Sequence, residues 1–525
     1  MATSTASPDT NAPPPPLRRA ARSALLAVVF ICAACGLVYE LALVTLGSYL
    51  IGNTATQAAI VLSVMVFAMG IGSLAAKPLQ NRAAVSFAVI ELVLALLGGL
   101  SVLALYGAFA YLSLYTQSLV VVAFVLGMLI GAEIPLLMVL LQHIRKQSAG
   151  SAVADLFAAD YVGALLGGLA FPFLLLPLLG QIRGALVVGM INAVAGAALV
   201  LIVFRRDLGR ARMLALGAGS VGVVAVLVAA MFYADTFEVN ARQALYRDPI
   251  VLADRTPIQD IVITNRGLPD GEDTRLFLNG DLQFSSVDEY RYHESLVHPA
   301  LAQKRDNVLI LGGGDGLALR EVLKYRDVQS VHLVELDPRM IDLARTDPRL
   351  TELNGNAFAD DRVSVVTADA FNWLREDSGL FDAVIVDMPD PDETATAKLY
   401  SVEFYGLIRG HLAPGARMVV QAGSPYFAPR SFWCIGRSIA EAGVTTAAYH
   451  VDVPSFGDWG FFLGAVGDVA PALTVDPAVD RRFLSADELD AARTFPPDRP
   501  PLEMPSSTLM QPRILEYSQS EWSVY

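Results

Sequence analysis

Residues 24–234 form an almost unbroken series of Ala, Val, Leu, Gly and Phe, and this half of the chain cannot fold as an ordinary soluble core. A helix that crosses a bilayer needs about 20 apolar residues. The sequence predicts membrane-spanning helices in seven stretches, 24–50, 58–76, 83–106, 118–141, 156–180, 184–204 and 213–234. From Phe237 onward, charged residues and turn formers occur at the density of a soluble protein.

This change in composition predicts several domains, and a chain of 525 residues is in any case too long for one core. We expect a disordered Pro-rich tail (1–22), a seven-helix transmembrane domain (23–235), a β-strand subdomain (236–300), a Rossmann-like domain (301–470) and a Pro-rich C-terminal extension (471–525). The extension is expected to pack on the surface or against the membrane helices, and the sequence assigns it no function.

Basic residues at the ends of the predicted spans indicate an orientation, because cytoplasmic loops of membrane proteins are rich in Lys and Arg. One side carries Arg18, Arg19, Arg22, Lys77, Arg82, Arg145, Lys146, Arg205, Arg206, Arg210 and Arg212. Only Arg183 opposes them, so the N-terminus is predicted to be cytoplasmic. Seven spans would place the soluble half on the other side, but a broken fifth span near Pro172 and Pro177 would change this count. The side of the soluble half therefore stays open.

Four acids lie in or at the edges of these spans: Glu40, Glu91, Glu133 and Asp160. An ionisable group is costly there and usually faces a cavity or a partner. A cation path and hydrogen bonding between helices are both open. Cys32 and Cys35 have redox-like spacing, but no basic neighbour would lower a thiol pKa, so we expect them to pack inside the first span. The six histidines show no metal-ligand spacing, and no metal is expected.

The formal net charge is −14, from 38 Lys and Arg against 52 Asp and Glu. Nucleic acid binding needs clustered cations, so the acidic excess argues against a nucleic-acid partner. An acidic protein suits a cationic small substrate better. With only three cysteines in the chain, no disulfide framework is expected in the soluble half.

The soluble half begins with two short strands, 258–264 and 275–280. From Asn307, strands alternate with amphipathic helices such as 317–325 and 398–411, which is typical of a parallel sheet with helices on both faces. The predicted strands are 307–311, 330–336, 362–368, 381–387, 416–421, 445–453 and 459–465. The fold class is a polytopic α-helical membrane domain followed by an α/β Rossmann-like domain of the class I methyltransferase type, which carries a small N-terminal β-hairpin subdomain.

Acids follow or end four predicted strands. The first strand runs into a glycine loop that ends in Asp315, and the second ends near Glu335, where an acid can bind ribose hydroxyls. Asp369 and Asp387 end the third and fourth strands. Carboxyl ends of parallel strands meet at one edge, so these acids are expected to share a crevice. Asp315 would repel a pyrophosphate and attract a sulfonium or an amine, which favours a nucleoside with a positive tail over NAD or ATP.

At this point the sequence resembles the polyamine aminopropyltransferase (spermidine synthase) family, and in particular its membrane-fused bacterial members. The resemblance covers about 255–467 and rests on LNGDLQFSSVDEYRYHESLVHPAL (278–301), VLILGGGDGLALREVLKY (308–325), VHLVELD (331–337), TADAF (367–371) and VIVDMPDP (384–391). It implies an enzyme that transfers the aminopropyl group of decarboxylated S-adenosylmethionine to an amine such as putrescine. The adenosyl compound is a co-substrate, and no prosthetic group is implied.

The family's functional positions can be carried over residue by residue. On the side of the adenosyl co-substrate they are Gln259, Gly312, Gly314, Asp315, Glu335, Asp369 and Ala370. Gln259 and Glu335 would bind the ribose side, Asp369 and Ala370 the adenine, and Asp315 the aminopropyl ammonium. On the side of the amine they are Tyr292, His293, Asp315 and Asp390.

Asp387 resembles the family's proton acceptor. An aliphatic amine with a pKa near that of Lys, about 10.4, is protonated at neutral pH and must lose a proton before it attacks. An Asx turn with Pro389 and Pro391 is the structural alternative for Asp387 and Asp390. The sequence departs from the family pattern at Ile258, at Leu317 and at residues 388–389, which leaves the acceptor amine open.

Two other functions stay open at this stage. One is a methyltransferase that uses intact S-adenosylmethionine, and the other is a polyamine transporter or sensor whose soluble half only binds. Besides the small substrates, membrane lipid is an expected partner, and a homo-oligomer is an open alternative.

Overall fold

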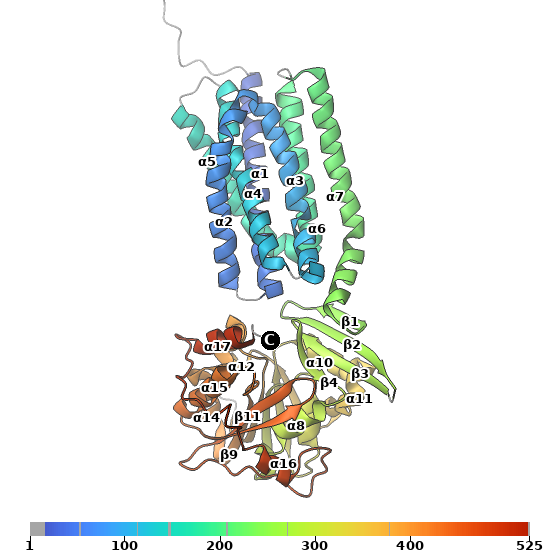
Figure 1. Ribbon diagram of the computed structural model, residues 1–525, viewed down its shortest axis with the longest axis vertical. Helices are drawn as coiled ribbons and strands as arrows, with labels where there is room; N and C mark the ends of the chain where they lie inside the picture. Colours follow the sequence, from blue (N-terminus) through green and yellow to red (C-terminus); the bar gives the residue numbers. More distant parts are fainter. Residues whose placement is uncertain are drawn as a thin grey trace, which may run out of the picture. The chain divides into compact units, whose positions relative to one another are not determined.

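The computed structural model describes residues 16–51, 54–112, 114–144, 149–205, 208–269, 271–376 and 379–522. These residues form two compact units, divided in the sequence between Leu245 and Tyr246 (Figure 1). The finer boundaries at residues 300 and 470 stay predictions.

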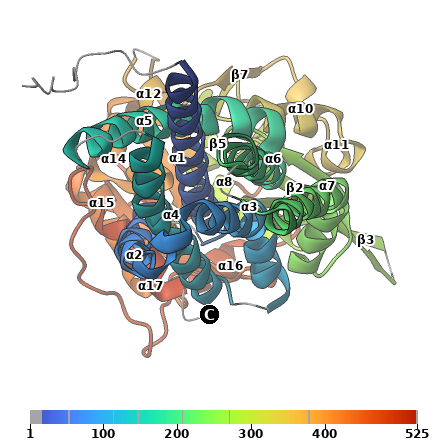
Figure 2. The same ribbon diagram turned by 90° about the horizontal axis from the view of Figure 1, so that it is seen from above.

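The first unit consists of long helices. They are α1 (Pro16–Ile51), α2 (Thr54–Ala75), α3 (Ala83–Gly107), α4 (Tyr115–Ile144), α5 (Ala149–Ala170), α6 (Leu176–Ala198) and α7 (Arg210–Leu245). A 3-10 turn covers Lys77–Arg82, and π-helical turns cover Ala108–Leu112, Phe171–Leu175 and Leu199–Val203. Helix α1 packs against α2 to α6, and Figure 2 shows the bundle along its helix axes.

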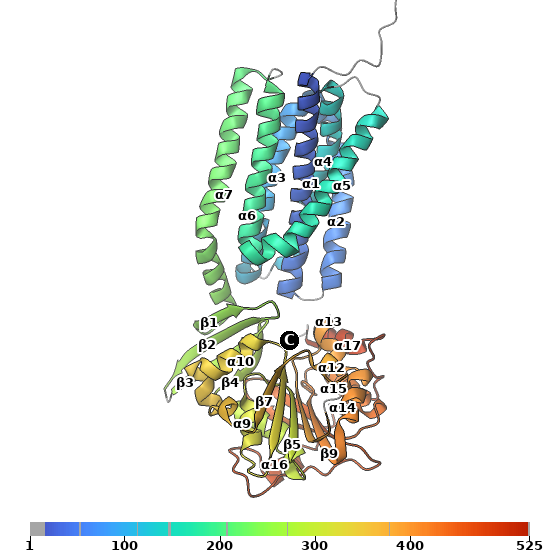
Figure 3. The ribbon, with the colours of Figure 1, turned by 180° about the vertical axis from the view of Figure 1, so that it is seen from behind.

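Six stretches of this unit are long and apolar enough to cross a membrane, where the sequence predicted seven. The difference lies in Val153–Val203, a single helical stretch of 51 residues that joins the spans predicted at 156–180 and 184–204. Its backbone is non-helical at Gly180, with φ 69° and ψ −176°, and Figure 3 shows α5 and α6 as two separate rods. One glycine thus turns the chain at the end of the span predicted at 156–180, because glycine adopts positive φ without a steric penalty.

Residues 16–22, which were predicted to belong to a disordered tail, are helical. Helix α1 begins at Pro16, and proline is well tolerated at the first position of a helix because its missing N–H would have no partner there. Residues 1–15 lie outside the described residues.

The outer surface of the helical unit is apolar and its interior is tightly packed. Phe232 and Phe173 are 84% and 78% exposed, as suits side chains that face lipid. Inside, a Cβ atom added to Gly131 of α4 would lie 2.1 Å from the backbone oxygen of Met69 in α2. Small residues allow such close helix contacts in membranes.

The second unit starts with a four-stranded antiparallel sheet. Its strands, in spatial order, are β1 (Ile250–Arg255), β2 (Asp260–Leu268), β3 (Gly271–Leu278) and β4 (Asp281–Ser285). Strands β2 and β3 occupy the two segments where the sequence predicted a hairpin. The structure adds a strand on each side of them.

A seven-stranded sheet forms the centre of this unit, in the order β10-β11-β9-β8-β5-β6-β7. Its strands are β5 (Asn307–Gly312), β6 (Ser330–Glu335), β7 (Val363–Thr367), β8 (Phe381–Asp387), β9 (Leu412–Gln421), β10 (Thr445–Val453) and β11 (Gly457–Ala465). The sheet is parallel from β7 to β9, and β11 runs antiparallel to both of its neighbours. This confirms the Rossmann-like prediction.

Helices cover both faces of this sheet (Figure 3). They are α8 (Glu289–Val297), α9 (Leu317–Leu323), α10 (Pro338–Thr346), α11 (Pro348–Asn354), α12 (Ala370–Trp373), α13 (Thr394–Ala397), α14 (Val402–Gly410) and α15 (Pro429–Glu441). Alternate residues of β5 enter two different cores. Val308 and Ile310 pack with α8 and α9, whereas Leu309 and Leu311 pack with α14 and α15.

The C-terminal extension is built into the second unit. Leu484 and Leu489 enter one core, and Ile514 enters the other. The Glu294 carboxylate accepts hydrogen bonds from the backbone N–H groups of residues 482–484. The segment ends in two helices, α16 (Ala486–Ala491) and α17 (Arg513–Trp522).

Candidate active site

A cavity of about 580 Å³ opens at the carboxyl ends of the parallel strands in the second unit. Strand β5 has β6 as its neighbour on one side and β8 on the other, so the strand order reverses next to β5. The cavity lies at this switch point, which is the usual ligand position in such folds. All eleven residues singled out from the sequence line it: Gln259, Tyr292, His293, Gly312, Gly314, Asp315, Glu335, Asp369, Ala370, Asp387 and Asp390. The prediction of a shared crevice is therefore confirmed in its geometry.

The glycine loop after β5 is held against the ends of the neighbouring strands. Gly312 has φ +83°, and a Cβ atom there would lie 2.0 Å from the backbone oxygen of Asp387. A Cβ atom on Gly314 would lie 2.7 Å from Oε2 of Glu335. A larger residue at position 312 would displace the end of β8, and one at position 314 would displace the Glu335 side chain. The glycines therefore let the loop approach Asp387 and Glu335 closely.

Asp315 and Glu335 form the acidic floor next to this loop. Oδ1 of Asp315 accepts the Leu317 N–H at 2.9 Å, and Oε1 of Glu335 accepts the Asp337 N–H at the same distance. Burial raises the pKa of both carboxyl groups, that of Glu335 to about 7. A cationic ligand beside them would restore the charged forms.

Asp387 lies in a network with Tyr292 and His293. The Tyr292 hydroxyl donates a 2.6 Å hydrogen bond to Oδ1 of Asp387. Burial raises the pKa of Asp387 to about 6, although the nearby His293 charge and the Tyr292 bond favour the carboxylate. The carboxylate is therefore mostly ionised at neutral pH and can accept a proton.

His293 is kept protonated by Glu289. Its Nδ1 lies 2.9 Å from Oε2 of Glu289, which also accepts a 2.9 Å hydrogen bond from Arg320. Burial by itself would lower the pKa of His293, but the bond and charge of Glu289 outweigh it and raise the pKa to about 9. A positive charge thus stands near Asp315 and Asp387.

A second acidic group lines the cavity around Asp390. Burial raises the pKa of Asp390 and of Asp392 to about 6, and that of Asp281 to about 7. Nε2 of Gln421 donates to the backbone oxygen of Met388 at 2.6 Å and to Oδ1 of Asp390 at 3.2 Å. Gln421 therefore fixes the loop that carries both Asp387 and Asp390.

Among the predicted site acids in the described residues, Asp369 is the one that forms an ion pair with a lysine side chain. Its Oδ1 accepts the Asn372 N–H and so caps α12, and its Oδ2 lies 2.6 Å from Nζ of Lys398. This ion pair and the cap lower its pKa against the effect of burial. Asp369 positions the start of α12, next to Ala370, and adds less free negative charge to the cavity than the other acids.

The sequence reasoning missed two parts of the cavity wall. Gln421 ends β9 at the same sheet edge, so the strand-end rule could have found it. Gln519 and Trp522 come from α17, and no sequence signal pointed to them. Nε2 of Gln519 donates to the backbone oxygen of Asp392 at 2.7 Å, and the Trp522 ring lies 6.4 Å from that of Trp459, which also lines the cavity.

The cavity as a whole is acidic. Its lining includes eight carboxyl groups: Asp281, Asp315, Glu335, Asp369, Asp387, Asp390, Asp392 and Glu393. Among the described lining residues, the only basic groups are Lys398 and His293, and both are bonded to carboxylates. Such a lining suits a ligand with more than one positive charge.

Comparisons with known proteins identify the family of the chain. Residues 289–473 match the family described as "Spermine/spermidine synthase domain". The chain is 59% identical to polyamine aminopropyltransferase 1 of Streptomyces coelicolor over 97% of this chain and 96% of that one. It is 46% identical to the polyamine aminopropyltransferase of Mycobacterium tuberculosis over 95% and 97% of the two chains.

Among solved structures, a spermidine synthase in complex with the transition-state analogue AdoDATO is 28% identical, with a TM-score of 0.43 over 47% of this chain and 85% of that chain. The similarity to the two relatives covers at least 95% of this chain, so it extends over residues of both units. By sequence identity over nearly its whole length, the chain belongs to the polyamine aminopropyltransferase family.

Proposed function

We propose that this protein transfers the aminopropyl group of decarboxylated S-adenosylmethionine to a polyamine acceptor such as putrescine. The observation that carries the proposal is the convergence of eight carboxyl groups on one cavity beside the glycine loop. Both substrates are cations, one through a sulfonium and an ammonium, the other through two ammonium groups. Family membership supports the same reaction.

In the proposed step, the nitrogen of the acceptor attacks the methylene carbon next to the sulfonium. A carbon–nitrogen bond forms, the carbon–sulfur bond breaks, and its electron pair stays on sulfur in neutral methylthioadenosine. The amine must first give up a proton, and Asp387 is the proposed acceptor because it lines the cavity and is a carboxylate near neutral pH.

Asp315 is proposed to bind the aminopropyl ammonium, and Glu335 with Gln259 the ribose. Asp315 would repel the carboxylate of intact S-adenosylmethionine, so the decarboxylated compound is preferred. The acceptor amine is proposed to lie along Tyr292, His293 and Asp390. The negative charge of Asp390 would hold the amine in the orientation for attack, and this orientation would supply much of the rate enhancement.

Helix α17 is proposed to close the acceptor end of the cavity. Gln519 is bonded to the backbone of Asp392, two residues from Asp390, and Trp522 stands beside Trp459. Glu521 holds the helix in place, because its carboxylate accepts the backbone N–H groups of Arg430 and Ser431, each at 3.0 Å. The C-terminal extension would thus take part in acceptor binding.

The direct test incubates the purified full-length protein with decarboxylated S-adenosylmethionine and a panel of diamines, and follows methylthioadenosine. Release that depends on an amine is expected, and intact S-adenosylmethionine should not replace the decarboxylated compound. Absence of release with every amine, or methyl transfer from the intact compound, would contradict the proposal.

The helical unit is proposed to be embedded in the cell membrane with its N-terminus in the cytoplasm. Its long apolar helices and exposed apolar side chains support this location. Arg22 of α1 forms an ion pair with Asp155 of α5 at 2.6 Å. Arg183, which lies on the other side of the predicted spans, forms an ion pair with Asp235 of α7. Carbonate extraction of membranes and a reporter fused to the N-terminus test the location and the orientation separately.

A further inference from the structure

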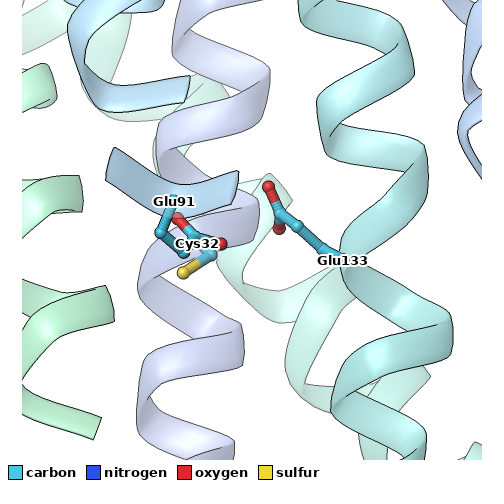
Figure 4. A group of neighbouring side chains, drawn as sticks. All are labelled: Cys32, Glu91 and Glu133. Atoms are coloured by element: carbon cyan, nitrogen blue, oxygen red, sulfur yellow. The ribbon is translucent and has the colours of Figure 1, made fainter. Parts of the chain in front are cut away.

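Three chemically reactive side chains meet inside the helical unit (Figure 4). They are Cys32 of α1, Glu91 of α3 and Glu133 of α4, which are 2%, 0% and 5% exposed. One ligand atom from each, the sulfur and two carboxylate oxygens, all lie within 4.8 Å of one another. Figure 4 shows Glu133 extending from α4 toward the other two residues. The residues come from three helices, so no local sequence spacing marks the cluster.

Asn192 of α6 supplies a fourth polar group. It is fully buried, and its amide oxygen lacks a hydrogen-bond partner among the described residues. A Cβ atom on Gly196, one turn further along α6, would lie 2.6 Å from Cβ of Glu91. Residues four apart share a helix face, so the face that carries Asn192 is turned toward Glu91. The amide adjoins the Glu91 carboxyl group.

Several carboxyl oxygens of this cluster have no donor in hydrogen-bond geometry among the described residues. Both Glu91 oxygens and Oε1 of Glu133 are buried without a hydrogen-bond partner in the part of the chain that the structure describes. Glu91 and Glu133 lie close enough to interact, so a proton shared between the two carboxyl groups is the alternative to a bound ion. Buried polar atoms without partners are rare in native proteins, and a bound ion or a water molecule can satisfy them.

We propose that Cys32, Glu91 and Glu133 bind one divalent cation of the zinc class, with the Asn192 oxygen as a fourth ligand. Zinc accepts Cys sulfur together with carboxylate oxygen, whereas magnesium and calcium take oxygen ligands only. Two carboxylates balance a double positive charge in an apolar environment. A metal ion also needs only the space between its ligand atoms, while a polyamine would need room for its chain.

The spacing of the ligand atoms fits a site that contracts on binding. At zinc–oxygen and zinc–sulfur bond lengths of about 2.0–2.3 Å, tetrahedral ligand atoms lie roughly 3.3–3.8 Å apart. Side chains within 4.8 Å of one another reach this geometry by shifts of about 1 Å or less. The ion would then cross-link α1, α3, α4 and α6, and its binding energy would add to the stability of the bundle.

The test uses the full-length protein, purified in detergent without a polyhistidine tag. We expect elemental analysis to find one zinc ion per chain. When cobalt replaces zinc, we expect a sulfur-to-cobalt charge-transfer band in the near-ultraviolet absorption spectrum. Cys32→Ser should remove that band. Glu91→Gln and Glu133→Gln should each weaken metal binding by about tenfold or more. Added zinc should raise the thermal unfolding midpoint of the helical unit in the wild-type protein but not in these variants.

Cys35→Ser is the matched control, because Cys35 is buried on the same helix but its thiol donates to the backbone oxygen of Val188 at 3.8 Å. It should keep the cobalt band. Gel filtration and aminopropyl transfer report whether each variant still folds. A wild-type protein that binds no stoichiometric zinc or cobalt, a band that survives Cys32→Ser, or Glu91-dependent binding of radiolabelled spermidine in place of metal would overturn the proposal. None of these outcomes depends on the proposed transfer reaction.

Discussion

The hydroxyl group of Tyr292 donates a 2.6 Å hydrogen bond to Oδ1 of Asp387, and thereby joins helix α8 to the end of strand β8. This bond stabilises the charged form of the carboxylate that we propose as the base. It also fixes the direction of one of its two oxygens, which leaves the other for the amine.

Replacement of Asp387 by Asn should lower kcat by about 10²- to 10⁴-fold, because the base is lost while the shape of the side chain is kept. Binding of methylthioadenosine, measured by titration calorimetry, should change far less. Asp361→Asn is the control, since Asp361 is exposed and does not line the cavity. A near-normal kcat in Asp387→Asn would show that another group accepts the proton.

Replacement of Tyr292 by Phe should shift the pH profile of kcat. A base with a pKa of about 6 makes the rate rise with pH through that value. Without the Tyr292 bond the carboxylate is less stabilised, so the midpoint should move to higher pH by about one unit. A profile measured from pH 5 to 8 checks this. An unchanged midpoint would mean that the bond has no influence on the ionisation of Asp387.

The stability of the second unit should fall at alkaline pH. The pKa of His293 is about 9 in the folded protein, above the ordinary value of about 6.5, so its contribution is complete below pH 6.5 and is lost as pH rises through 9. The loss is on the order of 3 kcal/mol. All four tryptophans lie in this unit, so their fluorescence reports its thermal unfolding selectively. Glu289→Gln should flatten the pH dependence, and a slope as steep as in the wild type would contradict this role of Glu289.

Replacement of Trp522 by Ala should raise KM for the amine about tenfold and leave binding of methylthioadenosine nearly unchanged, if α17 borders the acceptor end as proposed. Glu516→Ala is the matched control, as this residue is exposed on the same helix. Steady-state kinetics with varied amine separates the two effects. Equal losses for amine and nucleoside would place α17 in a purely structural role.

Gly312→Ala should destabilise the second unit by several kcal/mol, because the new Cβ atom meets the backbone of β8 and the residue has φ +83°. Nucleoside binding should be lost as well. Gly406→Ala, in α14, introduces a Cβ atom with no neighbour within 4 Å and should be neutral or stabilising. Tryptophan-detected melting of both variants makes the comparison.

The sequence by itself determined the parallel sheet and the acids at its carboxyl edge. Strand periodicity and the glycine loop are local signals, and parallel strands necessarily bring their ends to one edge. Asp315, Glu335 and Asp387 were therefore found without a structure. Gln421 follows the same rule and could have been found with them.

Only the tertiary structure decided which side chains meet across long separations in the chain. The ion pair of Asp369 with Lys398, the placement of α17 against the acidic loop, and the meeting of Cys32, Glu91 and Glu133 each depend on packing between elements. The same holds for Gly180, where one residue turns a continuous helix. A local stretch of sequence determines hydrophobic periodicity and secondary-structure propensity. Contacts between distant elements depend on how the whole chain packs, so no single stretch of sequence predicts them.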